Sequence, residues 1–383
     1  MLRRLRVKNY KSLRNLDLRL NGLNVLVGPN AAGKSNILDC LAFVGELARG
    51  PGPPAFERRG GFADMVWGGV ETERIEIGLQ LELPSGRRKE ALAYSLSVGP
   101  ETKGAIQGEA AWFGDLDASG PTPVFYREGT LIHYPGRGRT VSVDSGRDSA
   151  LAHVPPEEPE AGSFASALAS IAIHDFEKAR IATSQPVKRE TRVAPDGSNA
   201  ASVLHYLRNE ETEAAERIEN LLKDAIPEVT RLQTHLDPRK DGHVYIAFRE
   251  KHVPGRIPAW NISEGSARLV ATLLALLAPP APSLVAIEAP ETALHPYLCE
   301  YLVDILKLGA RQTQVLITTH SPYLLDYLPS ESLIIVEKDK GETRARRVRP
   351  SKDALKEAVR VLGLGKTWYA GHLGGVPSGS SSP

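Results

Sequence analysis

The sequence has few of the features that define several classes of protein. Its 383 residues include two cysteines, Cys40 and Cys299, and neither belongs to a CxxC pair. This argues against a disulfide framework or a zinc site and fits a reducing compartment. The basic N-terminus lacks the apolar core of a signal peptide. Because the formal net charge is +1, the chain is not a general polycation, and any basic surface must be local.

The chain also lacks a long uninterrupted apolar run. Its most apolar stretch, residues 269–287, contains Pro279, Pro280 and Pro282, so it predicts a buried helix, a turn and a strand rather than a membrane span. No internal repeat or sustained heptad pattern is present, which excludes a long coiled coil. We therefore expect a cytoplasmic globular protein that does not bind a membrane.

The first part of the chain has the pattern of strands around one helix. Residues 2–20 alternate between apolar and polar side chains, which predicts a two-stranded hairpin. Residues 23–27 form an apolar run before a glycine, and apolar residues at helical spacing follow from Ser35. Residues 73–145 contain short alternating runs typical of antiparallel strands. We expect an N-terminal lobe over residues 1–150.

The rest of the chain changes pattern twice. Residues 151–230 contain two helical segments, which predict a helical insertion or lid. Within residues 231–370, apolar strands at 283–288 and 314–319 are separated by a helix, and this alternation predicts a parallel sheet. The low-complexity tail, 371–383, is expected to be disordered. The fold class is therefore α/β, with the N- and C-terminal lobes sharing one sheet.

A phosphate-binding loop lies between the first apolar strand and the first helix. Residues 28–35 read GPNAAGKS, a complete G-x-x-x-x-G-K-S/T motif. In such a loop the backbone amides surround the phosphates, Lys34 supplies a charge and the Ser35 hydroxyl ligates Mg²⁺. The predicted nucleotide contacts are Gly28, Pro29, Asn30, Ala31, Ala32, Gly33, Lys34, Ser35 and Asn36. The strand before it and the helix after it argue against a chance match, and they predict a P-loop NTPase.

Three later segments supply the other groups that a nucleotide needs. Glu288 ends an apolar strand, where it is either a second Mg²⁺ ligand or a solvated strand end. His320 follows the next apolar strand, as a γ-phosphate sensor or as a structural histidine. Ser263 and Gly265 open a helix whose free amides favour an anion, although Ser263 with Ser266 is also an ordinary capping pair.

The joint occurrence of these motifs resembles the ABC-type ATPase heads of the RecF, OLD and SMC group, in particular its compact bacterial branch. The resemblance rests on residues 9–13, 28–36, 196–204, 262–268, 287–296 and 318–328. It implies an ATPase head with an N-terminal antiparallel β subdomain and a helical insertion, which uses ATP and Mg²⁺. It also implies a homodimer in which Ser263–Arg268 contacts the γ-phosphate bound by the other copy.

The sequence departs from this group at the position that follows the metal-binding carboxylate. Relatives have a second carboxylate there to polarise water, whereas this chain has Ala289, so we expect slow ATP hydrolysis. Glu291 is an uncertain substitute as the catalytic base. Gln80 is the best candidate for a Q-loop glutamine, or is simply exposed on a strand. Residues 333–341 faintly resemble the opening of a Toprim nuclease domain, but a terminal strand explains them better.

Three basic clusters could contact double- or single-stranded DNA, or could be solvated faces. Their members are Arg3, Arg4, Arg6 and Lys8, then Lys188, Arg189 and Arg192, then Arg344, Arg346, Arg347 and Arg349. The favoured function is an ATP-dependent conformational switch in DNA repair, other DNA metabolism or anti-phage defence. The alternative is a hydrolysis-deficient ATP-sensing module that controls a separately encoded effector protein.

Overall fold

The computed structural model describes residues 1–85, 88–100, 104–348 and 359–375. The chain divides into two compact units. The first comprises residues 1–171, 331–349 and 373–383, and the second comprises residues 172–330 and 350–372. These limits differ from the lobe boundaries after residues 150 and 230 that the sequence analysis expects, and most of the tail, residues 376–383, lies outside the described residues.

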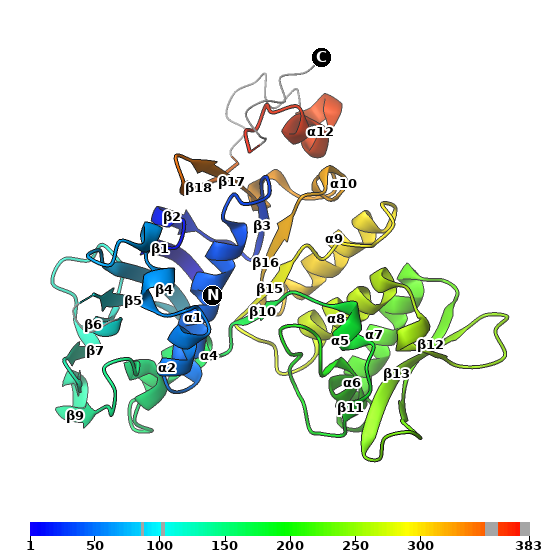
Figure 1. Cartoon of the computed structure of the whole chain (residues 1–383), viewed down its shortest axis with the longest axis horizontal. Helices are drawn as coiled ribbons and strands as arrows, with labels where there is room; N and C mark the ends of the chain where they lie inside the picture. The colour runs from blue at the N-terminus through cyan, green and yellow to red at the C-terminus, as the bar shows by residue number, and fades with distance from the viewer. Residues whose placement is uncertain (86–87, 101–103, 349–358, 376–383) are drawn as a thin grey trace. The chain divides into compact units, whose positions relative to one another are not determined.

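The first unit contains an eight-stranded antiparallel sheet in the order β2-β1-β4-β5-β6-β7-β8-β9 (Figure 1). Its strands are β1 (Leu2–Tyr10), β2 (Leu13–Arg19), β4 (Ile75–Ser85), β5 (Arg88–Gly99), β6 (Ala105–Phe113), β7 (Pro123–Glu128), β8 (Leu131–Tyr134) and β9 (Arg139–Ser142). The sequence predicted both the hairpin at the start and the antiparallel strands after it. Short-range alternation was sufficient because each strand pairs with a neighbour in the chain, except where β1 pairs with β4.

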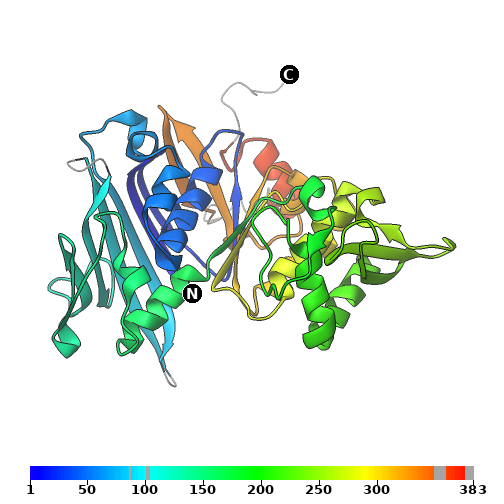
Figure 2. The ribbon, with the colours of Figure 1, turned by 60° about the horizontal axis from the view of Figure 1, so that its bottom comes forward.

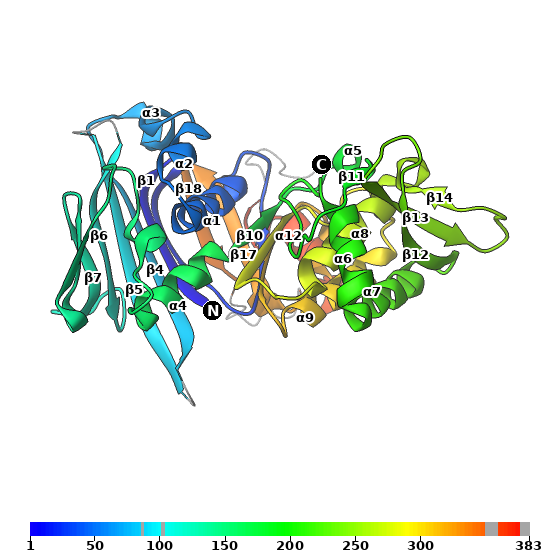
Figure 3. The same ribbon diagram turned by 90° about the horizontal axis from the view of Figure 1, so that it is seen from below.

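A second group of strands in this unit carries the phosphate loop. Strand β3 (Leu23–Val27) is parallel to β17 (Leu333–Asp339), which pairs in turn with the antiparallel β18 (Glu342–Arg347). Helix α1 (Lys34–Arg49) follows β3 and buries Ile37, Leu41 and Val44. Smaller helices are α2 (Pro53–Glu57), α3 (Phe62–Met65) and α4 (Pro159–Ala169). Figures 2 and 3 show α1 and α4 on the same face of the antiparallel sheet.

Close packing against α1 explains why residues 159–169 belong to the first unit. A Cβ atom added to Gly45 of α1 would lie 3.2 Å from the carbonyl oxygen of Leu168 in α4. Arg49, in the last turn of α1, donates a hydrogen bond to the carbonyl of Ile171. The pairing of β17 with β3 likewise returns residues 331–348 to this unit.

The second unit contains three parallel strands, β10 (Ala172–His174), β15 (Leu284–Glu288) and β16 (Gln314–Thr319), with β15 paired to both others. Its helices are α5 (Lys178–Ile181), α6 (Ala200–Glu210), α7 (Thr212–Ala225), α8 (Glu264–Leu277), α9 (Leu298–Gly309), α10 (Pro322–Leu325) and α12 (Leu364–Tyr369). The parallel pair and its connecting helix α9 confirm the α/β pattern predicted for this region. Helix α9 has twelve residues and connects the two buried strands, as expected of a β-α-β unit.

A small antiparallel sheet completes the second unit. It contains β11 (Gln185–Pro186), β12 (Val229–Leu236), β13 (His243–Glu250) and β14 (Ile257–Pro258), with β13 paired to the other three. Helices α6 and α7 lie on one side of the β12–β13 hairpin (Figures 1 and 3). Leu232 and Phe248 are paired across the hairpin and are fully buried.

Candidate nucleotide site

The predicted phosphate loop connects β3 to α1 in the first unit. Gly28 lies so close to β17 that an added Cβ would be 2.0 Å from the carbonyl oxygen of Val336. Gly33 has a φ of +103°, and a Cβ there would be 1.9 Å from Thr343 Oγ1. Both glycines of the motif are therefore required by the local packing as well as by any phosphate.

Two hydroxyl groups hold this loop from behind. Thr343 in β18 donates a hydrogen bond from Oγ1 to the carbonyl of Ala32 at 2.8 Å. Its oxygen lies 2.7 Å from Ser12 Oγ, which also accepts a hydrogen bond from the Asn36 amide at 2.6 Å. The loop backbone is thus fixed by residues far from it in the sequence, which leaves its outer amides available to a ligand.

The two polar side chains of the motif differ in exposure. Lys34 is buried, and its ammonium donates hydrogen bonds of 2.9 Å to the carbonyls of Gly28 and Pro29. Ser35 is exposed in the first turn of α1. That turn contains no acidic residue, so the helix dipole and the free amides present a positive end to an anion. This arrangement can hold a phosphate group and its Mg²⁺.

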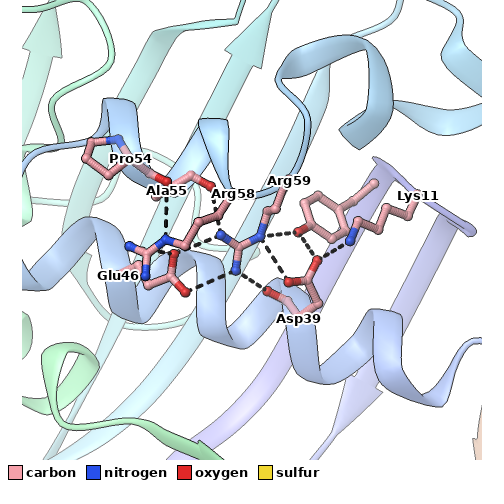
Figure 4. Close-up of polar contacts among 8 residues, drawn as sticks. Lys11, Asp39, Glu46, Pro54, Ala55, Arg58 and Arg59 are labelled. Atoms are coloured by element: carbon pink, nitrogen blue, oxygen red, sulfur yellow. Dashed lines mark hydrogen bonds and ion pairs between the residues drawn. The ribbon is translucent and has the colours of Figure 1, made fainter. Parts of the chain in front are cut away.

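Helix α1 is anchored by a cluster of charged residues around Asp39 (Figure 4). Asp39 accepts hydrogen bonds from Tyr10 at 2.6 Å and Arg59 at 3.0 Å, and forms an ion pair with Lys11 at 2.5 Å. Burial alone would raise the pKa of Asp39, but Arg59, Lys11 and Tyr10 together hold that pKa below its usual value. Arg59 also contacts Glu46 at 2.8 Å. These contacts tie the helix to the end of β1.

In the second unit, residues 289–294 form a turn after β15, which we call the acidic turn. Its first residue has a strained backbone. Glu288 ends the strand with its side chain partly exposed. Ala289 has a φ of +41°, and its amide donates to both the carbonyl and the hydroxyl of Thr318 at 3.1 Å. The ends of β15 and β16 are therefore joined at the residue after the predicted metal ligand.

Glu291 links the same turn to the histidine segment. Its Oε1 accepts hydrogen bonds from Thr319 Oγ1 at 2.5 Å and from the backbone amide of His320 at 3.3 Å. Its Oε2 is buried and has no hydrogen-bond partner among the described residues. Burial raises the pKa of Glu291. Glu291 therefore positions the His320 backbone, while the His320 residue is itself exposed.

Residues Ser263–Arg268, which we call the signature segment, begin α8, and Ser263 is the N-cap of this helix. Ser263 Oγ accepts the amide hydrogen of Ser266 at 3.1 Å and lies 2.8 Å from Ser266 Oγ. Gly265 faces the acidic turn so closely that a Cβ would be 2.4 Å from the carbonyl oxygen of Ala293. The capping interpretation is confirmed, and Ser263 stays exposed at the helix N-terminus.

Arg268, whose role the sequence analysis missed, joins the signature helix to the acidic turn. Its guanidinium is buried and donates to the carbonyls of Glu288 at 3.3 Å, Ala289 at 3.1 Å and Phe176. Its position, one and a half turns into an apolar helix, was the available signal, because a buried arginine must bind acceptors. Within this unit, Ser263, Gly265, Glu288, Glu291 and His320 thus belong to one connected set of turns.

The structure also shows the contacts of the Q-loop candidate and of the three basic clusters. Gln80 lies on β4, where its amide donates to Asp115 at 2.5 Å. The N-terminal basic cluster is largely ion-paired, since Arg4 and Arg6 both contact Asp117 within 2.7 Å. Further pairs or carbonyl contacts involve Arg3, Lys8, Arg344, Arg346 and Arg347. Arg349 lies outside the described residues, whereas Lys188, Arg189 and Arg192 are exposed.

Mg²⁺ fits the few oxygen ligands available. In the described part of the chain, no group of three or more His, Cys, Asp or Glu residues could hold a metal ion. Mg²⁺ commonly takes one or two protein ligands and completes its shell with phosphate oxygens and water. Each unit carries one oxygen of this kind: the exposed Ser35 hydroxyl in the first unit and the partly exposed Glu288 carboxylate in the second. No helix in the same described ranges is long and apolar enough to cross a membrane.

Known proteins share both the sequence pattern and the fold. The chain is 26% identical over 368 residues to a protein named OLD nuclease from Thermus scotoductus, covering 89% of this chain and 63% of that protein. It therefore spans less than two thirds of that relative's length. The structure of an Smc head bound to the C-terminal winged-helix domain of ScpA has a TM-score of 0.59 at 14% identity, covering 91% of this chain and 98% of that chain.

A second solved structure gives the same result for the fold. The Smc head domain with an extended coiled coil, bound to a ScpA domain derived from Pyrococcus furiosus, has a TM-score of 0.54 at 14% identity. It covers 94% of this chain and 98% of that chain. The P-loop fold and the resemblance to ABC-type ATPases of the RecF, OLD and SMC group are confirmed. Residues 23–326 match the family described as AAA domain, putative AbiEii toxin, Type IV TA system, and the chain belongs to this family.

Proposed function

We propose that this protein is an ATP-dependent conformational switch that binds ATP and Mg²⁺ and dimerises around the nucleotide. The observation that carries the proposal is the braced phosphate loop, in which Thr343 and Ser12 fix the backbone behind Gly33. A loop held in this way loses little further conformational freedom when it binds phosphate, which favours tight binding. Lys34 would exchange its two carbonyl acceptors for phosphate oxygens.

In this proposal, the Mg²⁺ ligands are the Ser35 hydroxyl and the Glu288 carboxylate. The metal ion neutralises charge on the β- and γ-phosphates, as in other P-loop NTPases. His320 is proposed to sense the γ-phosphate, because its backbone is fixed by Glu291 while the residue is exposed. Family membership and the order of these segments in the chain support these assignments.

The second half of the proposal is a homodimer in which each copy completes the other's nucleotide site. Helix α8 has fourteen residues and begins with the exposed Ser263, so its N-terminal amides and dipole favour a phosphate. The first turn of α8 lies so close to Ala293 that residue 265 has no room for a side chain, which is why it is a glycine. We propose that this N-terminus contacts the γ-phosphate bound by the other copy.

The proposed setting is DNA repair, other DNA metabolism or anti-phage defence, with double- or single-stranded DNA as a partner. It rests on the similarity to the OLD nuclease and to Smc heads. An ATP-sensing module that controls a separate effector protein is a second candidate. Ala289 favours it because a methyl group cannot activate water, and Glu291 already uses one oxygen to bind Thr319 and His320.

Nucleotide binding is tested with Lys34→Ala in titration calorimetry. The variant should lose tight ATP binding, whereas Lys307→Ala, which removes an exposed lysine on α9, should bind ATP normally. Unchanged affinity in Lys34→Ala would show that the loop is not the phosphate site.

Phosphate release measured with and without DNA separates the switch from the sensor, since the sensor should show no DNA-stimulated turnover.

Dimerisation is tested by light scattering with a non-hydrolysable ATP analogue. The unchanged protein should gain mass toward a dimer, and Ser263→Arg should block this gain while it leaves ATP binding intact. Ser163→Arg, which places the same bulky charge at an exposed serine on α4, is the matched control. A protein that stays monomeric at saturating analogue would contradict the proposed assembly.

A further inference from the structure

One face of the small antiparallel sheet in the second unit presents four arginines that the sequence analysis did not single out. We call this the arginine face: Arg231 on β12, Arg239 after β12, Arg249 on β13, and Arg256 just before β14. All four are exposed. They come from three adjacent parts of one sheet, although they are spread over 26 residues of the sequence.

Strand register places Arg231 and Arg249 on the same side. Contacts place the other two with them, since Arg256 lies against His235 and Arg239 lies over the Trp260 ring that contacts Tyr245. Arg231 pairs with Arg249, and His235 pairs with Tyr245, on β12 and β13. Because side chains alternate along a strand, this set faces away from the buried pair Leu232 and Phe248. Helices α6 and α7 cover the side of the buried pair (Figure 3). The arginine face is therefore the other surface of the hairpin.

Aromatic rings support two of the guanidinium groups. The Arg256 guanidinium lies 6.0 Å from the centre of the Tyr245 ring, and that of Arg239 lies 4.7 Å from the Trp260 ring. The two rings contact each other with centres 4.8 Å apart. Cation–π contacts orient a guanidinium without using its N–H donors. Arg239 donates from Nε and Nη2 to Asp237, and Arg256 donates from Nη1 to His235, so the remaining N–H groups of both are available to an anion.

The acidic groups near this face do not balance its charge. Asp237 pairs with Arg239 at 3.0 Å, and Glu219 contacts Arg231 at 3.4 Å. Glu219 is also shared with Arg208 and Lys223, so one carboxylate serves three cations. Among the described residues, no carboxylate forms an ion pair with Arg249 or Arg256. The arginine face thus carries a net positive charge.

The histidine on this face is in keeping with a cationic surface. His235 Nδ1 lies 3.2 Å from Arg256 Nη1, and a guanidinium can only donate, so this nitrogen is unprotonated. Burial, followed by the charges of Arg256 and Arg249, lowers the pKa of His235. The histidine is neutral at physiological pH, and the positive charge resides on the arginines, whose planar forks match phosphate groups.

We propose that the arginine face binds the phosphate backbone of double-stranded DNA. Tyr245 is only 4% exposed and lies beneath the Arg256 guanidinium, and the Arg239 guanidinium lies over the partly exposed Trp260 ring. Both rings are thus already engaged by arginines and are poor platforms for an unpaired base. Single-strand binding usually depends on free rings, and the face therefore favours a duplex. The inference rests on the proposed DNA setting, and it replaces the ion-paired N-terminal cluster with a surface whose positive charge is only partly compensated.

Binding is measured by fluorescence anisotropy of a labelled duplex as a function of salt, using the full chain with and without an ATP analogue. Each phosphate contact adds about 0.9 to the slope of log affinity against log salt concentration. The double variant Arg249→Gln/Arg256→Gln should therefore lower that slope by about 1.8, and reduce affinity by roughly 60-fold at about 0.1 M salt. Lys307→Gln/Arg311→Gln removes two exposed charges at the end of α9 and should change neither quantity.

Two further measurements separate this inference from its alternatives. Lys188→Gln/Arg189→Gln/Arg192→Gln tests the exposed cluster predicted from the sequence, and should have a smaller effect than the pair on the arginine face. ATP binding by the Arg249→Gln/Arg256→Gln variant, measured by calorimetry, should be unchanged. If that variant binds duplex as the unchanged protein does, the inference is wrong, even where Lys34→Ala upholds the nucleotide site.

Competition identifies the partner class. An unlabelled single strand should compete less well than the duplex. Polyglutamate of equal charge should compete weakly, because its flexible chain does not hold its carboxylates at the fixed spacing of the duplex phosphates. Stronger competition by the single strand would overturn the duplex assignment. Polyglutamate that competes as well as the duplex would instead indicate an acidic protein partner.

Discussion

The structure makes Ala289→Glu the most informative change in the chain. Ala289 follows the proposed Mg²⁺ ligand Glu288, and its backbone is held by two hydrogen bonds from its amide to Thr318. Arg268 fixes the carbonyls of residues 288 and 289. The direction of the Cβ at position 289 is therefore set by the surroundings, and a longer side chain would extend from a fixed point.

The expected effect is large on hydrolysis and small on stability. A positioned general base contributes about 10²- to 10⁴-fold in rate, which corresponds to a barrier lower by about 3 to 5 kcal/mol. The φ of +41° costs about 1 to 2 kcal/mol for any residue with a Cβ. Alanine already bears this cost, so glutamate adds little backbone strain. The side chain at 289 is partly exposed, and the free energy of unfolding should change by less than about 0.5 kcal/mol.

The assay is single-turnover phosphate release at saturating ATP and Mg²⁺, with affinity measured separately by calorimetry. Ala289→Gln is the matched control, because it adds the same length without a base and should not accelerate release. Affinity should be similar in all three proteins, since the phosphate loop is unchanged. The reasoning fails if the unchanged chain already turns over several times per second and Ala289→Glu adds nothing. Glu291 would then be the first alternative base to test.

Three other changes test the contacts around the site. Arg59→Met should destabilise the protein by about 3 kcal/mol, because it leaves Asp39 and Glu46 without their shared buried partner, and thermal unfolding measures this loss. Thr343→Val should weaken ATP binding and cost about 1 to 3 kcal/mol of stability by removing the donor to the Ala32 carbonyl, while Thr343→Ser should preserve both. Because burial raises the folded-state pKa of Glu291, its contribution to stability is complete below the ordinary carboxyl pKa and is lost as the pH rises through the raised value. Glu291→Gln should remove this pH dependence of denaturant unfolding, and a catalytic-base role would be indicated instead if it abolished hydrolysis without changing the profile.

Local patterns predicted the segments that depend on neighbouring residues. The phosphate loop was predictable because β3, the turn and α1 are consecutive, and a glycine with positive φ is visible in the motif at Gly33. The capping role of Ser263 depends on Ser266, three residues later. In both cases the physical cause lies within one or two turns of the chain.

The residues that stabilise the site could not be predicted, because their hydrogen-bond partners are distant in the sequence. Thr343 and Ser12, which hold the phosphate loop, are separated by 331 residues, and nothing near Thr343 in the sequence indicates a loop. Arg268 binds carbonyls twenty and twenty-one residues away. Backbone carbonyls are present at every residue, so a sequence contains no sign of which one an arginine will meet.

Charge clusters in the sequence were a poor guide to charged surfaces. Arg4 and Arg6 are close together in the chain, but folding brings Asp117 to both of them. The members of the arginine face are instead dispersed in the chain, and the pairing of β13 with β12 and β14 brings them together. Alternation along β12 and β13 was the available signal. Charge on a surface is decided by the partners that folding supplies, and only secondarily by the spacing of basic residues.

Arg268 offers a physical link between the proposed dimerisation and ATP hydrolysis. Its guanidinium connects α8, whose N-terminus is proposed to meet the other copy's nucleotide, to the turn that contains Ala289. Any shift of α8 on dimerisation would therefore move the carbonyls of residues 288 and 289 and the groups bonded to them. The same turn is joined to His320 through Glu291. A contact made at Ser263 would thus reach both the proposed metal ligand and the proposed phosphate sensor, and through them the proposed assembly would be coupled to hydrolysis.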